Sequence, residues 1–302
     1  MKSSKGRGAF EFRSTDGTRL MGWRSGTAGV PLVLSPGLGT PPEAWPLLIR
    51  PDSGFSVTTF YYRGTGGSER PADLSRIRVE DHVGDLIALL DHEGIDRALV
   101  AGWSIGVNLA FELAQRQPER VAALLSVAGV PGGSLESFFA PVGVPKPLRK
   151  TAAVAVCNLA RALGPGLSAL ARGVPKVELL ARVIAHTGFM LPAARPATTL
   201  PALTEFFRND FRWYFELALA AGEHPPMDVS FLKCPTTVVA GRWDSLTAFE
   251  DVRELARRIP HAKLVELSGS HFLPLEYPEK MLELARELAE PLQSSQPAAA
   301  AG

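Results

Sequence analysis

The sequence has almost no excess of positive over negative charge, and this balance excludes one class of partner. The chain has 302 residues, of which 21% are charged, and its formal net charge is only +1. Lys and Arg are scattered among Asp and Glu and form neither a basic stripe nor a basic arm. We therefore expect no binding to nucleic acid, because recognition of phosphates depends on such concentrations of positive charge.

Cysteine is also scarce, since the chain contains only Cys157 and Cys234. Their separation matches neither the short spacing of a zinc site nor the pattern of a disulfide framework. Isolated cysteines of this kind are commonly buried free thiols, and we expect that here. We expect no metal ion and no cofactor.

Long hydrophobic runs are missing as well. The longest candidate, Thr151 to Ala160, is interrupted by Arg161, whereas crossing a bilayer takes about 18 or more apolar residues. We expect no membrane span. The N-terminus, MKSSKGRGAFEFRS, is basic but lacks the apolar core and cleavage site of a signal peptide, which indicates a cytoplasmic protein.

What the chain does contain is an alternation of strand-like and helical segments. Alternating residues on both sides of Thr15-Asp16-Gly17 predict an antiparallel hairpin. Further strands are predicted at residues 30–34, 55–62, before Gly102, and at 121–128, 236–240 and 263–267, with helices at 79–92, after Gly106, and at 249–258 and 279–292. This order predicts an α/β fold with a mostly parallel sheet and helices on both faces.

The alternation stops at Pro131-Gly132-Gly133, and for about a hundred residues only helical patterns remain. We predict a core in two parts, residues 1–131 and 231–292, with a helical cap inserted at 132–230 and a disordered tail at 293–302. Within the cap, apolar residues recur at helical spacing: Leu203, Phe206, Phe207, Phe211, Tyr214, Phe215 and Ala218.

The stretch Gly102-Trp103-Ser104-Ile105-Gly106 joins a predicted strand to a predicted helix. A serine on such a tight turn presents its hydroxyl clear of the backbone, and the glycines on both sides avoid Cβ clashes. Ser104 is the candidate nucleophile. The Ile105 N–H, at the positive end of the helix, is a candidate donor to an oxyanion.

A serine hydroxyl needs a base, and the base needs an orienting carboxylate. His271 is the only histidine in a loop directly after a late predicted strand, and Asp244 follows the strand TTVVAGRW. An alternative role for Asp244 is to cap the next helix, although Thr247 is better placed for that. The other histidines are interpreted as structural, with His224 left open as a pocket residue.

These ordered motifs resemble the α/β-hydrolase family, in which nucleophile, acid and base follow the chain order of Ser104, Asp244 and His271. The resemblance implies a second oxyanion donor, the Leu38 N–H, in a loop where Pro36 replaces the usual histidine. It also implies a structural role for the loop 63–68, which has the family's Arg-Gly-x-Gly-x-Ser pattern but Tyr61 at the usual acidic position.

The apolar cap predicts the kind of substrate. We predict that Trp103, Phe207, Phe211 and Phe272 line a cleft between the cap and the sheet. A cleft with few fixed charges favours an uncharged, partly apolar small molecule, because a buried carboxylate or phosphate would need a paired cation.

The sequence thus predicts a cofactor-independent serine hydrolase that cleaves an apolar carboxylic ester through an acyl-enzyme. Lactonase, thioesterase, C–C bond hydrolase and acyltransferase activities use the same three residues and stay open. Dehalogenases and epoxide hydrolases of this fold carry aspartate where this chain has Ser104. An alternative of another class is a non-catalytic small-molecule binding protein on the same fold. The oligomeric state is left open.

Overall fold

The computed structural model describes residues 8–26, 28–140, 143–173, 190–191 and 194–294. Within these residues, eight strands form one sheet. The strands are β1 Gly8–Arg13, β2 Arg19–Ser25, β3 Val30–Ser35, β4 Phe55–Phe60, β5 Ala98–Trp103, β6 Val121–Val127, β7 Thr236–Gly241 and β8 Lys263–Leu267. Their order across the sheet is β1-β2-β4-β3-β5-β6-β7-β8.

The sheet is mostly parallel, as predicted. The expected hairpin is the antiparallel pair β1 and β2, and β2 also pairs antiparallel with β4. All other neighbouring strands are parallel, so that their carboxyl ends meet at one edge. The strand predicted to reach Ala128 ends one residue earlier, because Ala128 has a φ of 47°, in the left-handed region.

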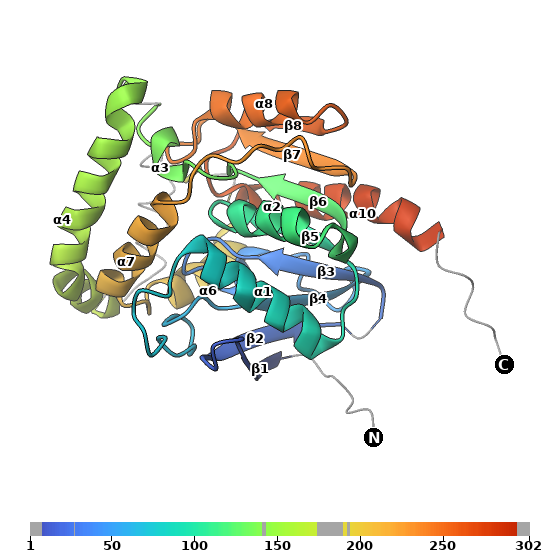
Figure 1. Cartoon of the computed structure of the whole chain (residues 1–302), viewed down its shortest axis with the longest axis horizontal. Helices are drawn as coiled ribbons and strands as arrows, with labels where there is room; N and C mark the ends of the chain where they lie inside the picture. Colours follow the sequence, from blue (N-terminus) through green and yellow to red (C-terminus); the bar gives the residue numbers. More distant parts are fainter. Residues whose placement is uncertain (1–7, 27, 141–142, 174–189, 192–193, 295–302) are drawn as a thin grey trace.

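Helices cover both faces of the sheet (Figure 1). One face carries α1 Val79–Glu93, α2 Gly106–Arg116 and α8 Phe249–Arg258, and the other carries α10 Pro278–Ser294 and the short helix η1 Pro42–Ala44. Short turns of helix occur at η2 Pro118–Arg120 and α9 Leu273–Glu276. Along β3, Val33 faces the first helical layer, whereas Leu32 and Leu34 face the second. This alternation explains why central strands appear as continuous apolar runs.

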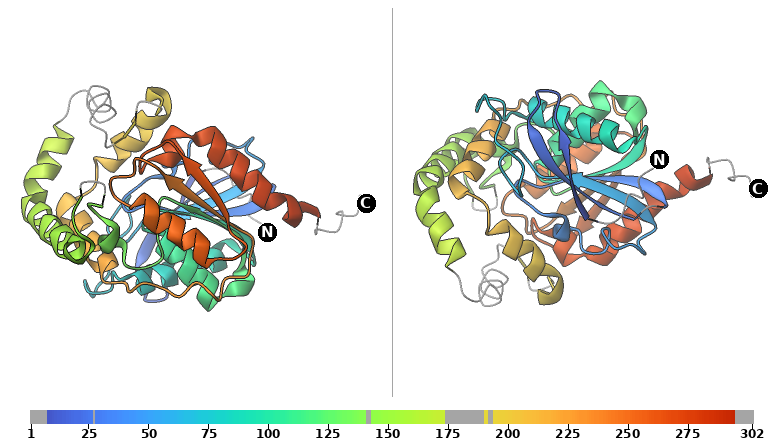
Figure 2. Two further views of the ribbon diagram at one scale, coloured as in Figure 1. Left: turned by 90° about the horizontal axis from the view of Figure 1, so that it is seen from above. Right: turned by 90° about the horizontal axis from the view of Figure 1, so that it is seen from below.

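The cap lies beyond the carboxyl edge of the sheet, between β6 and β7 in the chain (Figures 1 and 2). Its described helices are α3 Ser134–Ser137, α4 Lys146–Arg172, α6 Pro196–Phe206 and α7 Phe211–Gly222. The boundaries at residues 131/132 and 230/231 stay predictions. The apolar pattern of residues 203–218 forms two helices rather than one. The break comes where Asp210 caps α7 by accepting hydrogen bonds from the Arg212 and Trp213 amides.

The structure adds detail to two sequence expectations. Arg161 interrupts the apolar run that begins at Thr151 but does not end the helix, because α4 continues to Arg172 and is by length and composition alone apolar enough to cross a membrane. Its inner face, however, is buried against the cap at Ala153 and Cys157. Cys234 is only half-buried, in contrast to Cys157. The predicted tail lies outside the described residues beyond Ser294.

The loop 63–68 has a structural role that centres on Arg63, which is almost completely buried. Its guanidinium donates to both carboxylate oxygens of Asp85, at 2.7 and 2.8 Å, and to Asp16 at 2.6 Å. The Trp213 indole of α7 donates to the Arg63 carbonyl at 2.7 Å. Arg63 therefore anchors α1 and the hairpin through its ion pairs and the cap through its backbone carbonyl, and its buried charge is matched.

Substitution of Asp85 tests this anchor. Burial by itself would raise the pKa of Asp85, but hydrogen bonds and charge from Arg63 and His82 hold the pKa below its ordinary value of 3.8. The pair therefore stabilises the fold above about pH 4 and loses this contribution as the pH falls through the lowered pKa. Asp85→Asn should cost about 3–5 kcal/mol near neutral pH and clearly less near pH 3, as measured by urea unfolding.

The matched control is Asp52→Asn, which removes the exposed partner of Arg50 from a similar two-bond pair. Solvent screens that pair, so the control should change the free energy of unfolding little at either pH. Equal losses for both variants, or a loss for Asp85→Asn that does not depend on pH, would contradict the assignment.

Candidate active site

The turn from β5 to α2 holds Ser104 in a strained backbone conformation, with a φ of 56°. This turn is sterically possible because Gly102 and Gly106, two positions before and after Ser104, have no Cβ. A Cβ on Gly106 would lie 2.1 Å from the Ser35 carbonyl oxygen, and one on Gly102 would lie 2.7 Å from the Gly106 oxygen. The close approach of α2 to the end of β3 thus requires both glycines.

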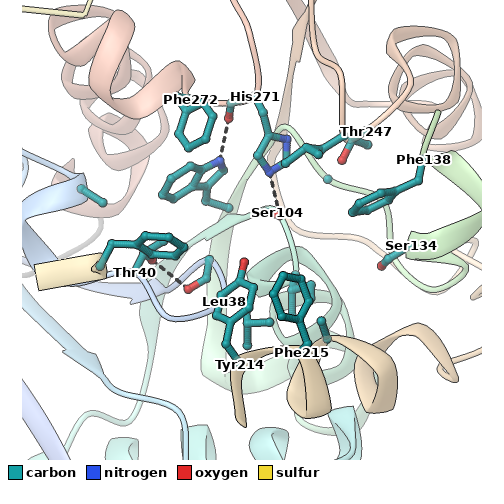
Figure 3. Close-up of a pocket in the computed structure, with 18 of the residues that line it drawn as sticks. Leu38, Thr40, Ser104, Ser134, Phe138, Tyr214, Phe215, Thr247, His271 and Phe272 are labelled. Atoms are coloured by element: carbon teal, nitrogen blue, oxygen red, sulfur yellow. Dashed lines mark hydrogen bonds between the residues drawn. The ribbon is translucent and has the colours of Figure 1, made fainter. Parts of the chain in front are cut away.

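Ser104, His271 and Asp244 lie in hydrogen-bonding contact. His271 Nε2 is 2.8 Å from Ser104 Oγ, and His271 Nδ1 is 2.9 Å from Asp244 Oδ2 (Figure 3). The carboxylate and imidazole are almost completely buried, whereas the serine hydroxyl is partly accessible. Three loops that follow β5, β7 and β8 bring these residues to the same edge of the sheet.

Asp244 does not cap α8, the alternative considered for it. Helix α8 begins at Phe249 and has no side-chain cap. Asp244 Oδ1 instead accepts hydrogen bonds from the Leu246 and Thr247 amides at 2.8 and 2.7 Å. Thr247 is not the cap either, because its hydroxyl donates to the Ala128 carbonyl. These bonds hold the carboxylate toward His271.

The two candidate oxyanion donors are the backbone amides of Leu38 and Ile105. Both residues border the cavity at Ser104. Among the residues that the structure describes, neither amide has a hydrogen-bond acceptor. Ile105 also stands at the N-terminus of α2, where the helix dipole favours negative charge.

The loop 35–40 is held in place although Pro36 occupies the position of a histidine. The Tyr62 hydroxyl donates to the Pro36 carbonyl at 2.8 Å, and the Thr40 amide and hydroxyl donate to the Gly37 carbonyl. From the cap, Asn209 Nδ2 donates to the Gly39 carbonyl at 2.9 Å. Backbone carbonyls and partners distant in the sequence thus replace the missing histidine.

Ser104 opens into a cavity of about 370 Å³ between the cap and the sheet. All four predicted pocket residues, Trp103, Phe207, Phe211 and Phe272, line it. Its described lining contains no Asp, Glu, Lys or Arg, and His271 is its one titratable nitrogen side chain. Burial of an anion here would lack a compensating cation.

Several lining residues were not identified from the sequence. Tyr214 and Phe215 of α7 extend into the cavity, together with Thr40, Ser134 and Phe138 (Figure 3). Burial raises the pKa of Tyr214, which keeps its hydroxyl neutral. The helical pattern of the cap contained Tyr214 and Phe215, but periodicity alone does not distinguish a face that packs from a face that borders a cavity.

Trp103 both lines the cavity and supports the histidine. Its buried indole Nε1 donates to the His271 carbonyl at 2.9 Å, and its ring meets Phe272 edge to face. This bond fixes the backbone that carries the imidazole. No sequence pattern could have identified the bond, since the two residues are 168 positions apart.

His224 does not line the cavity. Its Nδ1 lies 3.1 Å from Glu80 and its Nε2 lies 3.3 Å from Glu112, at the junction of cap and core. His82 contacts Asp85, also away from Ser104, and His186 lies outside the described residues. Nowhere in the described chain do three His, Cys, Asp or Glu side chains gather in a way that could hold a metal ion.

Substitution of Gly106 tests the turn. Gly106→Ala should prevent Ser104 from reacting with a fluorescent fluorophosphonate and should lower the free energy of unfolding by about 1–3 kcal/mol, because the methyl group meets the Ser35 carbonyl. The control is Gly84→Ala in α1, where the nearest atom lies 3.9 Å away. That change should leave labelling intact and stabilise the helix by about 0.5–1 kcal/mol. Similar behaviour of the two variants would refute the requirement.

Comparison with known proteins agrees with this architecture. Over 103 residues the chain is 35% identical to a protein from Azorhizobium caulinodans that carries the name of a carbamate hydrolase, RutD; this covers 34% of the chain and 38% of the relative. The chain thus spans well under half of that relative's length. It is 31% identical over 235 residues to 2-hydroxymuconate semialdehyde hydrolase from Pseudomonas putida, which covers 75% of the chain and 74% of that protein.

Among solved structures, the enol-lactonase from Burkholderia xenovorans LB400 is similar in fold, with a TM-score of 0.70 and 22% identity over 93% of the chain and 100% of that structure. Residues 30–278 match the family model of the alpha/beta hydrolase fold. The match extends from β3 to the start of α10 and includes the cap, so the chain belongs to the α/β-hydrolase fold family.

Proposed function

We propose that this chain is a serine hydrolase that cleaves a carboxylic ester of an apolar, uncharged small molecule. The observation that carries the proposal is the contact of Ser104 Oγ with His271 Nε2, and of His271 Nδ1 with Asp244, at the floor of an apolar cavity. Membership of a hydrolase family supports the proposal, because the relatives reported above carry hydrolase names.

In the first half-reaction, Ser104 Oγ attacks the ester carbonyl carbon while His271 Nε2 accepts the hydroxyl proton. Asp244 accepts a hydrogen bond from His271 Nδ1–H, so it selects the tautomer and stabilises the imidazolium. The carbonyl oxygen becomes an oxyanion, to which the Leu38 and Ile105 amides donate. The C–O bond then breaks, and His271 returns the proton to the leaving alcohol.

In the second half-reaction, water attacks the acyl-enzyme. His271 accepts one proton from the water, the oxyanion forms again at the same amides, and Ser104 leaves with the proton from His271. The product is a carboxylic acid. Its ionised form has no Lys or Arg to pair with in the described lining, so the acid is more stable as a carboxylate in water, which favours its release.

The lining also bears on the choice among acyl substrates. The Pseudomonas relative is named for 2-hydroxymuconate semialdehyde, a substrate that carries a carboxylate. The present cavity has no Lys or Arg among its described lining residues to pair with such a group. We therefore favour a neutral ester over an anionic substrate. A neutral lactone or thioester fits the same argument, and activity assays must separate them.

Replacement of Ser104 tests the chemistry. The wild type should react with a fluorescent fluorophosphonate and should hydrolyse p-nitrophenyl esters, whereas Ser104→Ala should do neither. The expected loss in kcat is on the order of 10³-fold or more. If the folded wild type is stabilised by neutral esters yet neither reacts with the reagent nor consumes them, the protein is a binding protein and the proposed activity is wrong.

A matched pair of esters tests the charge preference. The pair consists of a p-nitrophenyl ester with a terminal methyl ester and the same compound with a free terminal carboxylate. The neutral ester should have a kcat/KM at least about 100-fold higher, because burial of an unpaired carboxylate is costly. Equal kcat/KM values for the two compounds would show that the acyl chain does not enter the apolar cavity.

A further inference from the structure

The outer face of α4 exposes an apolar stripe that the catalytic proposal does not explain. Among the described residues, seven large apolar side chains are strongly exposed, and five of them belong to this one helix. The five are Leu148, Val156, Leu159, Leu163 and Leu170, with exposed fractions of 50–69%. Their spacing places them on a single side of the helix. Figures 1 and 2 show α4 at the outer edge of the cap.

The charge of α4 is of one sign. Its 27 residues include no Asp or Glu, whereas Lys146, Arg149, Lys150, Arg161 and Arg172 are basic. Lys146 and Lys150 lie in the first turns and Arg172 at the last residue, and all three are exposed. Lys150 and Arg161 contact Glu136 and Glu216 of neighbouring cap helices. The apolar stripe therefore lies between cationic ends.

We propose that this face of α4 binds the surface of an anionic lipid membrane. The stripe would enter the boundary between headgroups and acyl chains, and Lys146 and Arg172 at the two ends would meet lipid phosphates. A helix that combines a continuous apolar side with basic flanks is suited to lie in that boundary. The proposal goes beyond ester hydrolysis and does not depend on it.

The helix lies on the membrane in this proposal and does not cross it, because its inner face is part of the cap. Gly164 packs so closely against Arg212 that a Cβ would lie 2.4 Å from the Arg212 nitrogen. Ser168 Oγ accepts a hydrogen bond from the Phe211 amide at 2.9 Å. Insertion of the whole helix into lipid would break these contacts and the Arg161–Glu216 ion pair.

A second copy of the chain fits the stripe less well than a membrane does. From Leu148 to Leu170 the stripe is about 33 Å long and about 10 Å wide, which gives an area on the order of 330 Å², whereas stable interfaces bury about 800 Å² per partner. Pairing of α4 with another α4 would also bring basic ends together, since the helix has no acidic residue. An anionic lipid surface complements both the shape and the charge.

The same helix joins the stripe to the cavity. Cys157, on the inner face of α4, borders the cavity at Ser104, so a docked cap would hold the cavity about one helix diameter, about 10 Å, from the lipid. An apolar ester dissolved in the bilayer would then have a short path to the site. This consequence rests on the proposed function, whereas the binding of lipid does not.

Vesicle sedimentation tests the proposal with the full chain. The wild type should sediment with phosphatidylcholine vesicles that contain about 30% phosphatidylglycerol, less with pure phosphatidylcholine, and less at high salt. Leu159→Glu and Leu163→Glu should each weaken partitioning at least about tenfold. The matched control is Leu74→Glu, outside the cap, where the leucine is as exposed as Leu163 at 56%. That variant should bind like the wild type.

Two further measurements separate the possible failures. Ser104→Ala should sediment with vesicles like the wild type, which would show that vesicle binding does not require hydrolysis. Leu159→Glu and Leu163→Glu should unfold in urea at nearly the wild-type midpoint, which shows that they fold whether or not the protein hydrolyses esters. The proposal is overturned if the wild type does not sediment with anionic vesicles, or if all three leucine variants bind equally. The proposal is also overturned if the wild type does not sediment with vesicles but forms a dimer in solution, and Leu163→Glu converts that dimer to a monomer.

Discussion

The close contact between the start of α2 and the end of β3 is the constraint on which the candidate site depends. Gly106 touches the Ser35 carbonyl so closely that no side chain fits. This contact forces Ser104 into the left-handed region and directs the N-terminus of α2 toward the loop that carries Leu38. The close contact between Gly106 and the Ser35 carbonyl thus sets the position of the proposed nucleophile and of both proposed oxyanion donors. Parallel pairing of β3 with β5 maintains the contact.

Much of the fold could be predicted because the local patterns agree with one another. Strands buried on both faces appear as apolar runs, and the hairpin at Thr15-Asp16-Gly17 and the turn at Ser104 have residues suited to their geometry. The order Ser104, Asp244, His271 located the candidate site because each residue directly follows a predicted strand. Parallel strands bring such positions to one edge. The cytoplasmic location depends on terminal residues outside the described chain and stays a prediction.

Contacts between distant segments could not be predicted from local patterns. The Trp103 indole bond to the His271 carbonyl and the Tyr62 bond to the Pro36 carbonyl have no sequence signature. The cap illustrates the same limit. An apolar helical pattern does not show whether a face packs, borders a cavity or stays exposed. The cavity wall at Tyr214 and the exposed apolar stripe of α4 are defined only once the helices are assembled.

Helix α7 is fastened to the core near both of its ends. At its start, the Trp213 indole bonds to the Arg63 carbonyl, and beyond its end, His224 lies between Glu80 and Glu112 while its carbonyl accepts from the Gly133 amide. A helix bonded to the core at two points resists rotation. The cavity wall formed by Tyr214 and Phe215 of α7 therefore keeps its distance from Ser104. The part of the cavity wall that α7 supplies is therefore fixed relative to the core, whereas the part that α6 supplies, at Leu203, Phe206 and Phe207, does not share these two anchors.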